Sequence, residues 1–308
     1  AFAELEIGES VVVTYQVKVL NQLIGSDLVN RGVIAYTSMP GEDPAERTGE
    51  DGPGQLNDYT DADTETLTSE SIGGLSKTYW SDTQTNTFPF DLTIGERVVY
   101  RIFFDVPQGV VTNLQIRDRV PPGLDWVNGN SDTNLAFPGT GYRFDSPVGG
   151  PVYPTNATGG LVITDGDTDP STSLGNEGSG EDIVFTLPWV TNAPGPGGDT
   201  IELFLEFVVL DEAVNDGIGT PRHSDSNQVT VADTFTTLHA SAQPYTIAEP
   251  DLSISKSISP NEVDAGDTIT VTLEVENSAT ASANAYDIVV DDVLLDSLYA
   301  TATFTNLV

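Results

Sequence analysis

The sequence predicts an all-β protein made of antiparallel β-sandwich modules in tandem. Short runs of Val, Ile, Thr and Tyr alternate with polar residues, and Gly, Pro, Asn and Asp separate the runs. The nearest candidate for an amphipathic helix, residues 211–216, is too short to be stable. Hydrophobic residues make up 38% of the chain, and their regular alternation argues against disorder despite a formal net charge of −36.

Most of the expected strands are runs in which every second residue is apolar, so that one face can be buried. In chain order the runs are Val11–Val19, Leu28–Val33, Leu75–Tyr79, Ile94–Ile102, Leu114–Val120, Gly160–Ile163, Ile183–Leu187, Gly198–Leu203, Asn227–Val231, Leu252–Ser259, Ala265–Leu273 and Ile288–Leu294. Lys77 and Lys256 lie on the apolar faces of the third and tenth runs, whereas Lys18 lies on a polar face. Burying an isolated ammonium group is costly, so these two inward lysines need a chemical reason.

Charge and composition narrow the classes of function. The chain carries 47 acidic and 11 basic residues, and such a surface repels nucleic acid and anionic lipid headgroups while it attracts divalent cations. There is no cysteine, so disulfide cross-links are excluded. No apolar run reaches the length of a membrane span, and no basic and apolar leader is present. We therefore expect an interior or mature piece of a larger protein.

Two kinds of sequence block recur and divide the chain into modules. The first block, an inward lysine, a Gly-Asp/Glu turn and a later aspartate, occurs at Lys77, Gly95 and Asp118 and again at Lys256, Gly266 and Asp291. The second block, a Gly-Asp/Glu turn followed by an inward asparagine, occurs at Gly8 and Asn30 and again at Gly198 and Asn227. Their order predicts the C-terminal part of a module over 1–72, a complete module over 73–249 with an insertion at about 127–198, and the N-terminal part of a further module over 250–308.

This order of motifs resembles a known family. The order is Lys, then Gly-Asp/Glu with alternating Thr, Val and Tyr, then Val-x-Asp-x-Val/Leu-Pro, then Asn-x-Val/Ile. It resembles the Ig-like conserved repeat of large bacterial surface proteins, the domain-of-unknown-function repeat number eleven. More distantly, it is similar to the fimbrial isopeptide-forming domains of Gram-positive pilins. The resemblance covers most of the chain apart from the insertion, although Asp292-Val293-Leu294 lacks the proline of Arg119-Val120-Pro121. It implies Ig-like sandwiches with about seven strands in two packed sheets.

The resemblance to isopeptide-forming domains implies an autocatalytic cross-link in the complete module. Lys77, with a pKa lowered by burial, would attack the side-chain amide of Asn227. Asp118, protonated because it is buried, would polarise the amide carbonyl and shuttle protons as ammonia leaves. The alternative is a buried Lys77–Asp118 ion pair with Asn227 as a hydrogen-bond partner.

The terminal parts contain incomplete versions of the same set. By the resemblance, Lys256 and Asp291 have the roles of lysine and proton shuttle, and their asparagine is expected beyond Val308 or on another chain. Asn30 is the corresponding asparagine of the first part, and its lysine is expected before Ala1. A longer tandem array would supply the missing residues; alternatively, subunits join head to tail, and Lys256 and Asp291 of one face Asn30 of the next. Both hypotheses predict a long, fibre-like object.

The evidence for a metal site or an enzyme is weaker. Asp165, Asp167 and Asp169 alternate in the way that Ca²⁺ favours, but no glutamate follows at the spacing of an EF-hand. A solvated acidic loop is the favoured interpretation, with Ca²⁺ as the alternative and no other cofactor expected. His223 and His239 lack a nucleophile motif, and no phosphate-binding loop, zinc spacing or nucleophile elbow occurs. We therefore expect that the chain is not an enzyme.

These observations favour a mechanical function. Together with the resemblance, they indicate a structural module of a secreted bacterial surface adhesin, stalk or filament, and the resemblance implies that Lys–Asn isopeptide bonds stabilise it. Its partners would be neighbouring modules or subunits, head to tail, and a surface glycan or protein receptor. The alternative is a carbohydrate- or protein-binding module that uses the 127–198 insertion. Both hypotheses place the chain outside the cell, on a bacterial surface or in an extracellular filament.

Overall fold

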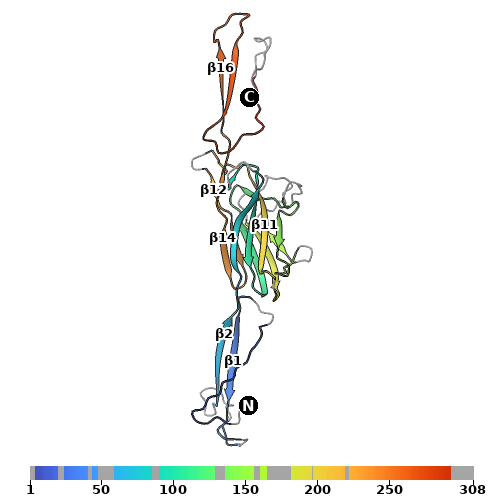
Figure 1. Cartoon of the computed structure of the whole chain (residues 1–308), viewed down its shortest axis with the longest axis vertical. Coiled ribbons are helices and arrows are strands. Elements are labelled where there is room, and N and C mark those ends of the chain that lie inside the picture. Colours follow the sequence, from blue (N-terminus) through green and yellow to red (C-terminus); the bar gives the residue numbers. More distant parts are fainter. Residues whose placement is uncertain are drawn as a thin grey trace.

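The protein is an elongated all-β molecule. The computed structural model describes residues 4–19, 24–40, 44–47, 59–84, 90–128, 136–155, 160–164, 182–195, 197–218 and 222–292. These residues form seventeen strands, and none of them lies in a helix, so the described chain offers no helix that could span a membrane. Figure 1 shows a β-sandwich in the middle, with one β-hairpin projecting from each end.

Two sheets form the sandwich. The strands of the first sheet are β6 (Gly109–Arg119), β9 (Val162–Thr164), β10 (Asp182–Asn192), β13 (Gln228–Ala232) and β14 (Thr237–Ser241), in the spatial order β14-β13-β6-β10-β9. The strands of the second are β3 (Gly73–Asp82), β5 (Arg97–Asp105), β7 (Leu124–Trp126), β8 (Tyr142–Asp145) and β11 (Thr200–Val209), in the order β3-β5-β11-β7, with β8 also paired to β11. A smaller sheet contains β4 (Asp91–Leu92), β12 (Ser224–Asp225) and β15 (Tyr245–Ile247).

The core lies between the two main sheets, because alternation along each central strand turns one set of side chains inward. Leu114 and Ile116 of β6, Phe185 of β10, and Tyr100 and Ile102 of β5 are fully buried members of one apolar cluster. The alternating runs predicted in this part of the sequence are therefore strands, and the expected all-β fold is confirmed.

Strand β10 shows that the segment expected as an insertion is partly structural. It pairs with β6 from Asp182↔Arg119 to Asn192↔Gly109, and β9 lies on its other side. The end of the 127–198 segment is thus a central strand of the first sheet. The physical reason is that its inward residues, Ile183, Phe185 and Leu187, fill the core.

A hairpin projects from each end of the sandwich (Figure 1). The first pairs β1 (Asp27–Ala35) with β2 (Thr60–Thr68), and the second pairs β16 (Leu252–Ser259) with β17 (Thr270–Asn277). Most of their side chains are exposed, in contrast to those of the sandwich. The first hairpin is anchored by Ile24, which is buried in the sandwich core and whose N–H donates to the Val110 carbonyl at 3.0 Å.

Two predicted strands are not strands in the structure. Residues 11–19 and 288–292 have no strand structure, and residues 11–19 are exposed. A strand persists only where a neighbour completes its hydrogen bonds, and within the described residues neither segment is paired with one. Apolar alternation therefore predicted that these segments could form strands, but it could not predict whether a neighbouring strand would pair with them.

One turn recurs in three parts of the chain. Gly8, Gly95 and Gly266 all have positive φ angles, of 90°, 81° and 102°. The acidic residue after each glycine folds back so that its carboxylate accepts the backbone N–H three residues before it. The three contacts are Glu6 N to Glu9 Oε2 at 3.1 Å, Thr93 N to Glu96 Oε2 at 2.8 Å and Asp264 N to Asp267 Oδ2 at 2.8 Å. The Gly-Asp/Glu motif thus encodes one turn at these three sites.

Candidate functional site

Lys77, Asp118 and Asn227 meet in the interior of the sandwich. Lys77 points inward from β3, at the edge of the second sheet, and Asp118 points inward from β6, in the middle of the first. Asn227 comes directly before β13, which pairs with β6. Their exposed fractions are only 3%, 0% and 0%, respectively. Side chains from distant parts of the sequence therefore share one water-excluded space.

The hydrogen bonding of this cluster is incomplete. Lys77 Nζ donates to Asp118 Oδ2 and lies 3.5 Å from the backbone carbonyl of Gln228, the residue after Asn227. The Asn227 amide lies close enough to Asp118 to donate toward its carboxylate, but neither Asp118 Oδ1 nor either side-chain amide atom of Asn227 has a hydrogen-bond partner in good geometry among the described residues. A fully buried amide whose hydrogen bonding is incomplete is unfavourable, so a structural role explains Asn227 only in part.

Burial shifts both ionisable groups toward their neutral forms. It lowers the pKa of Lys77 to about 8, although the charge of Asp118 and its hydrogen bond act in the opposite direction. Burial also raises the pKa of Asp118, against the opposing influence of the Lys77 ammonium and the nearby Asn227 amide. A neutral amine is a nucleophile and a neutral carboxylic acid is a proton donor, so the environment favours the two forms that amide attack requires.

Tyr100 is a member of the site that the motifs do not predict. Lys77 Nζ lies 5.4 Å from the centre of its ring. Tyr100 belongs to β5, which pairs with β3 and places Tyr79 opposite Tyr100. In the predicted strand over 94–102, alternation places Tyr100 on the same inward face as Ile102, and this is the signal in the sequence that could have identified Tyr100.

In the second hairpin the structure corrects the predicted partner of Lys256. The Lys256 ammonium pairs with Asp292 Oδ1 at 2.6 Å, and no ion pair links it to the predicted Asp291. Alignment of the two motifs explains the difference. When Ile116-Arg117-Asp118-Arg119-Val120 is aligned with Val290-Asp291-Asp292-Val293-Leu294, Asp292 takes the place of Asp118. Adjacent side chains of an extended chain point in different directions, so only one of the two aspartates can face the lysine. Unlike Lys77, Lys256 is 43% exposed in its side chain.

The remaining predicted site residues lie elsewhere. Asn30 is exposed on β1, where its amide donates to the Tyr15 hydroxyl at 3.4 Å. It is thus in the hairpin opposite to that of Lys256 (Figure 1). Asp165, Asp167 and Asp169 lie outside the described residues. Within the described ranges, no three His, Asp or Glu side chains are grouped so that they could hold a metal ion.

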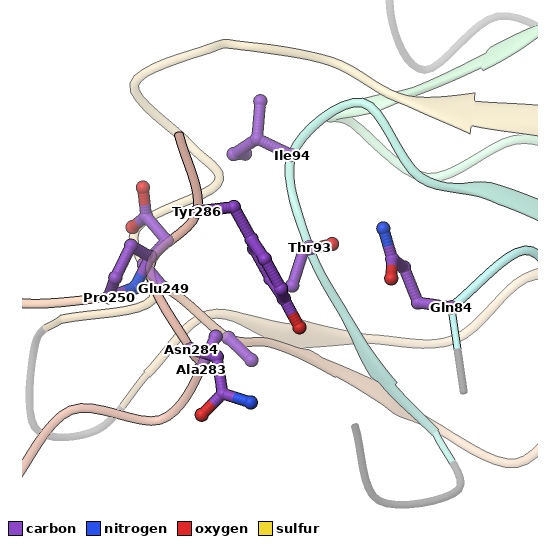
Figure 2. A pocket seen from close by; sticks show the side chains of 9 residues that line it. Gln84, Thr93, Ile94, Glu249, Pro250, Ala283, Asn284 and Tyr286 are labelled. Carbon is purple, nitrogen blue, oxygen red and sulfur yellow. The ribbon is translucent and has the colours of Figure 1, made fainter. Parts of the chain in front are cut away.

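The junction between the sandwich and the second hairpin is held by a hydrogen-bond network. Gly217 N donates to Glu249 Oε2 at 2.6 Å, and Glu249 N donates to Ser282 Oγ at 2.9 Å. Ser282 Oγ donates in turn to the Gly217 carbonyl at 3.1 Å. A pocket of about 240 Å³ lies beside this network, with Tyr286 of the hairpin unit and Thr93 of the sandwich on its walls (Figure 2). The pocket lies at a joint between two units, and the lysine cluster does not line it.

Comparisons with known proteins leave the family open. No family model matches the chain, and no curated protein matches it. Solved structures are similar to it, among them two major pilins and a DUF4466 family protein. The full-length major pilin SpaD from Corynebacterium diphtheriae matches with 14% identity and a TM-score of 0.31, over 79% of this chain and 65% of that one. The major pilin subunit BcpA of Bacillus cereus matches with 13% identity and a TM-score of 0.29, over 80% of this chain and 69% of that one.

The third is a DUF4466 family protein from Parabacteroides merdae, with 13% identity and a TM-score of 0.28, over 65% of this chain and 55% of that one. The chain therefore spans between 55% and 69% of the length of these three proteins. TM-scores and identities this low support no conclusion about what the chain does, and the function has to be argued from the site.

Proposed function

We propose that this chain is a load-bearing structural module of an extracellular bacterial filament, stalk or adhesin, and that its sandwich is locked by an isopeptide bond between Lys77 and Asn227. The observation that supports this is the buried cluster, in which Lys77 and Asp118 are in contact and the Asn227 amide lies beside Asp118 with its hydrogen bonding incomplete. We propose no substrate turnover, because the reaction consumes its own side chains once.

The proposed bond forms in a balanced condensation. Lys77 as a neutral amine attacks Cγ of Asn227, and protonated Asp118 donates to the amide oxygen. When the tetrahedral intermediate collapses, the Cγ–Nδ2 bond breaks and one proton of Lys77 Nζ passes through Asp118 to the leaving nitrogen. The products are a secondary amide and ammonia, with Asp118 returned to its starting form.

The position of the bond suits a protein under tension. The chain enters the sandwich at β3 from the first hairpin and leaves it after β15 toward the second hairpin, at the opposite end (Figure 1). A bond between Lys77, in the entering strand, and Asn227, near the exit, would carry force directly across the module. The intervening loop of about 150 residues would then bear no load.

Intact mass measurement tests this proposal. The purified chain should weigh about 17 Da less than its sequence, because one ammonia leaves in this covalent step. Tandem mass spectrometry should find the tryptic peptides of Lys77 and Asn227 joined. Asp118→Ala and Asn227→Ala should restore the full sequence mass, whereas Lys18→Met, which alters an exposed lysine outside the sandwich, should retain the loss. A wild-type chain of full sequence mass would leave only the ion-pair alternative.

The carbohydrate-binding alternative finds less support. Trp126 is buried, and the two exposed tryptophans lie on different sheets, Trp80 on β3 and Trp189 on β10. The Arg101 guanidinium also lies 5.4 Å from the ring centre of Trp80, over a face that a sugar would use. These tryptophans do not form a shared stacking platform.

A further inference from the structure

We infer that Lys256 and Asp292 are one half of an intermolecular cross-linking site, and that Asn30 of a second copy of this chain is the other half. The inference rests on the proposed function, since it extends the same Lys–Asn chemistry to the contact between two copies. The partner of each exposed hairpin is then the other hairpin of a second copy.

The second hairpin repeats the first two paired strands of the sandwich. Lys256 of β16 is opposite Leu273 of β17, as Lys77 of β3 is opposite Ile102 of β5. The turn before β17 has the same carboxylate-to-amide hydrogen bond as the turn before β5. Each lysine is ion-paired with an aspartate that follows in the sequence. The hairpin unit therefore already holds two of the three groups that the sandwich brings together.

The face of β16 that carries Lys256 is apolar and uncovered. Leu252, Ile254 and Ile258 share this face, and they are 43%, 61% and 44% exposed. In the sandwich, the corresponding side of β3 is covered by β13 and β14, the hairpin that follows Asn227. Within the described residues, no strand other than β17 pairs with β16. A hairpin that brings an asparagine would therefore both cover this face and complete the set.

The first hairpin has the properties that this site requires. Asn30 shares a face of β1 with Leu28 and Ile34, and Ile34 is 61% exposed. Glu65 of β2 is directly opposite Asn30, so a carboxylate lies beside the asparagine. Lys256 is the one charged strand residue of its own β16–β17 face, and its ammonium is paired there with Asp292.

The two hairpins of one molecule cannot meet, because they project from opposite ends of the sandwich (Figure 1). The first hairpin of a second copy can reach the second hairpin of the first. Such a head-to-tail contact uses two different surfaces and does not close on itself, so repetition produces a filament. Docking would also bury Lys256, which is exposed in the single chain, in the way that Lys77 is buried by β13 and β14.

The covalent step is the condensation described for the sandwich. A bond forms between Nζ of Lys256 and Cγ of the second copy's Asn30, and the Cγ–Nδ2 bond of Asn30 breaks. One proton of Nζ leaves with that nitrogen as ammonia, and Asp292 carries it and ends in its original form. Each contact therefore releases one ammonia and needs no oxidant or other reactant.

A mixing experiment with two variants of the whole chain tests the inference. Concentrated wild-type chain should give a ladder of dimers, trimers and longer species on a denaturing gel. Lys256→Ala and Asn30→Ala should each remain monomeric alone, because one half of the site is missing. When mixed, they should give a covalent dimer and nothing longer, since only one productive pair of residues remains. Asp292→Ala should abolish the ladder, and the adjacent Asp291→Ala should retain it.

The result is independent of the bond inside the sandwich. Lys77→Ala should lose the intramolecular mass difference and keep the ladder if the inference is right. A wild-type chain that shows the intramolecular loss but stays monomeric on the gel would overturn the inference and leave the proposed function standing. A ladder that survives in Lys256→Ala, or copies that associate only reversibly, would overturn it as well. Peptides joining Lys256 to Asn30 in the mixed dimer would establish it.

Discussion

The Lys77 cluster shows how burial selects the chemistry of a few residues. In water, a lysine and an aspartate would form a charged pair, but in the sandwich interior desolvation lowers the pKa of the amine to about 8 and raises that of the acid. Stability alone does not explain Asn227, whose buried amide lies beside Asp118 with its hydrogen bonding incomplete. A covalent bond would remove this unsatisfied amide by converting it to a linkage.

Asn227→Ala separates the covalent bond from the simple ion pair. If the bond forms, its loss should lower the thermal midpoint by about 10 to 20 °C, from a loop-closure contribution of roughly 4 to 5 kcal/mol in a domain of this size. If only the ion pair exists, the variant leaves Lys77 and Asp118 intact and removes only the contacts of the Asn227 amide, so the midpoint should fall much less. Differential scanning calorimetry decides between the two. Lys18→Met is the matched control and should melt like the wild type.

Glu96 predicts a pH dependence of stability. Burial, together with the charge of Asp82, raises the pKa of Glu96 from 4.5 to about 7, although hydrogen bonds from Thr93 and Gln84 oppose the shift. A carboxyl group whose pKa is higher in the folded state stabilises the fold when protonated, so its contribution is lost as the pH rises from about 4.5 to about 7. The free energy of unfolding of wild type minus that of Glu96→Gln should therefore fall over this range. A flat or rising difference in denaturant titrations would contradict the assignment.

At the scale of elements, one short turn is used in the sandwich, in the second hairpin and near the start of the chain. The turn depends on two features of the sequence: a glycine that tolerates positive φ, and an acidic residue whose carboxylate accepts a backbone N–H. In the sandwich it sets the start of β5, the strand that pairs with β3 and contributes Tyr100 to the lysine site. Local turn chemistry thus fixes the position of a functional strand.

Gly95→Ala and Gly73→Ala test this turn as a matched pair. A Cβ atom would meet no atom within 4 Å at either position, but only Gly95 has a positive φ, of 81°. We expect Gly95→Ala to lower the free energy of unfolding by about 1 to 2 kcal/mol, from the strain of a left-handed alanine. Gly73→Ala should be close to neutral. Equal effects of the two substitutions in denaturant titrations would show that φ is not the reason for the glycine.

At the scale of the whole molecule, the junctions connect the units into one rod. Ile24 fixes the first hairpin to the sandwich core, and Glu249 and Ser282 fix the second. With hairpins at opposite ends, a pulling force enters and leaves the sandwich at its two ends (Figure 1). A Lys77–Asn227 bond would keep residues 78–226 of the sandwich from extending under this force.

Single-molecule stretching tests this mechanical property. A chain held by its two ends should show no extension from residues 78–226 if the bond is present. Asn227→Ala should unfold with an added contour length of about 50 nm, from roughly 3.6 Å for each released residue. Lys256→Ala lies outside this loop and should behave like the wild type. An unfolding step of the full length in the wild type would contradict the bond.

The sequence by itself determined the all-β class, most of the central strands and the inward direction of Lys77, because alternation is a local property with a period of two. Tertiary structure decided what each inward residue meets. Asp118 and Asn227 reach Lys77 only because two sheets pack together. Lys256 pairs with Asp292, not with Asp291, because the path of a segment that pairs with no described strand decides which of two adjacent side chains faces the lysine. The same limit explains why residues 11–19 alternate without forming a strand. The face of a strand on which a residue lies follows from its neighbours in the chain, whereas the residues that it contacts come from segments far away in the sequence.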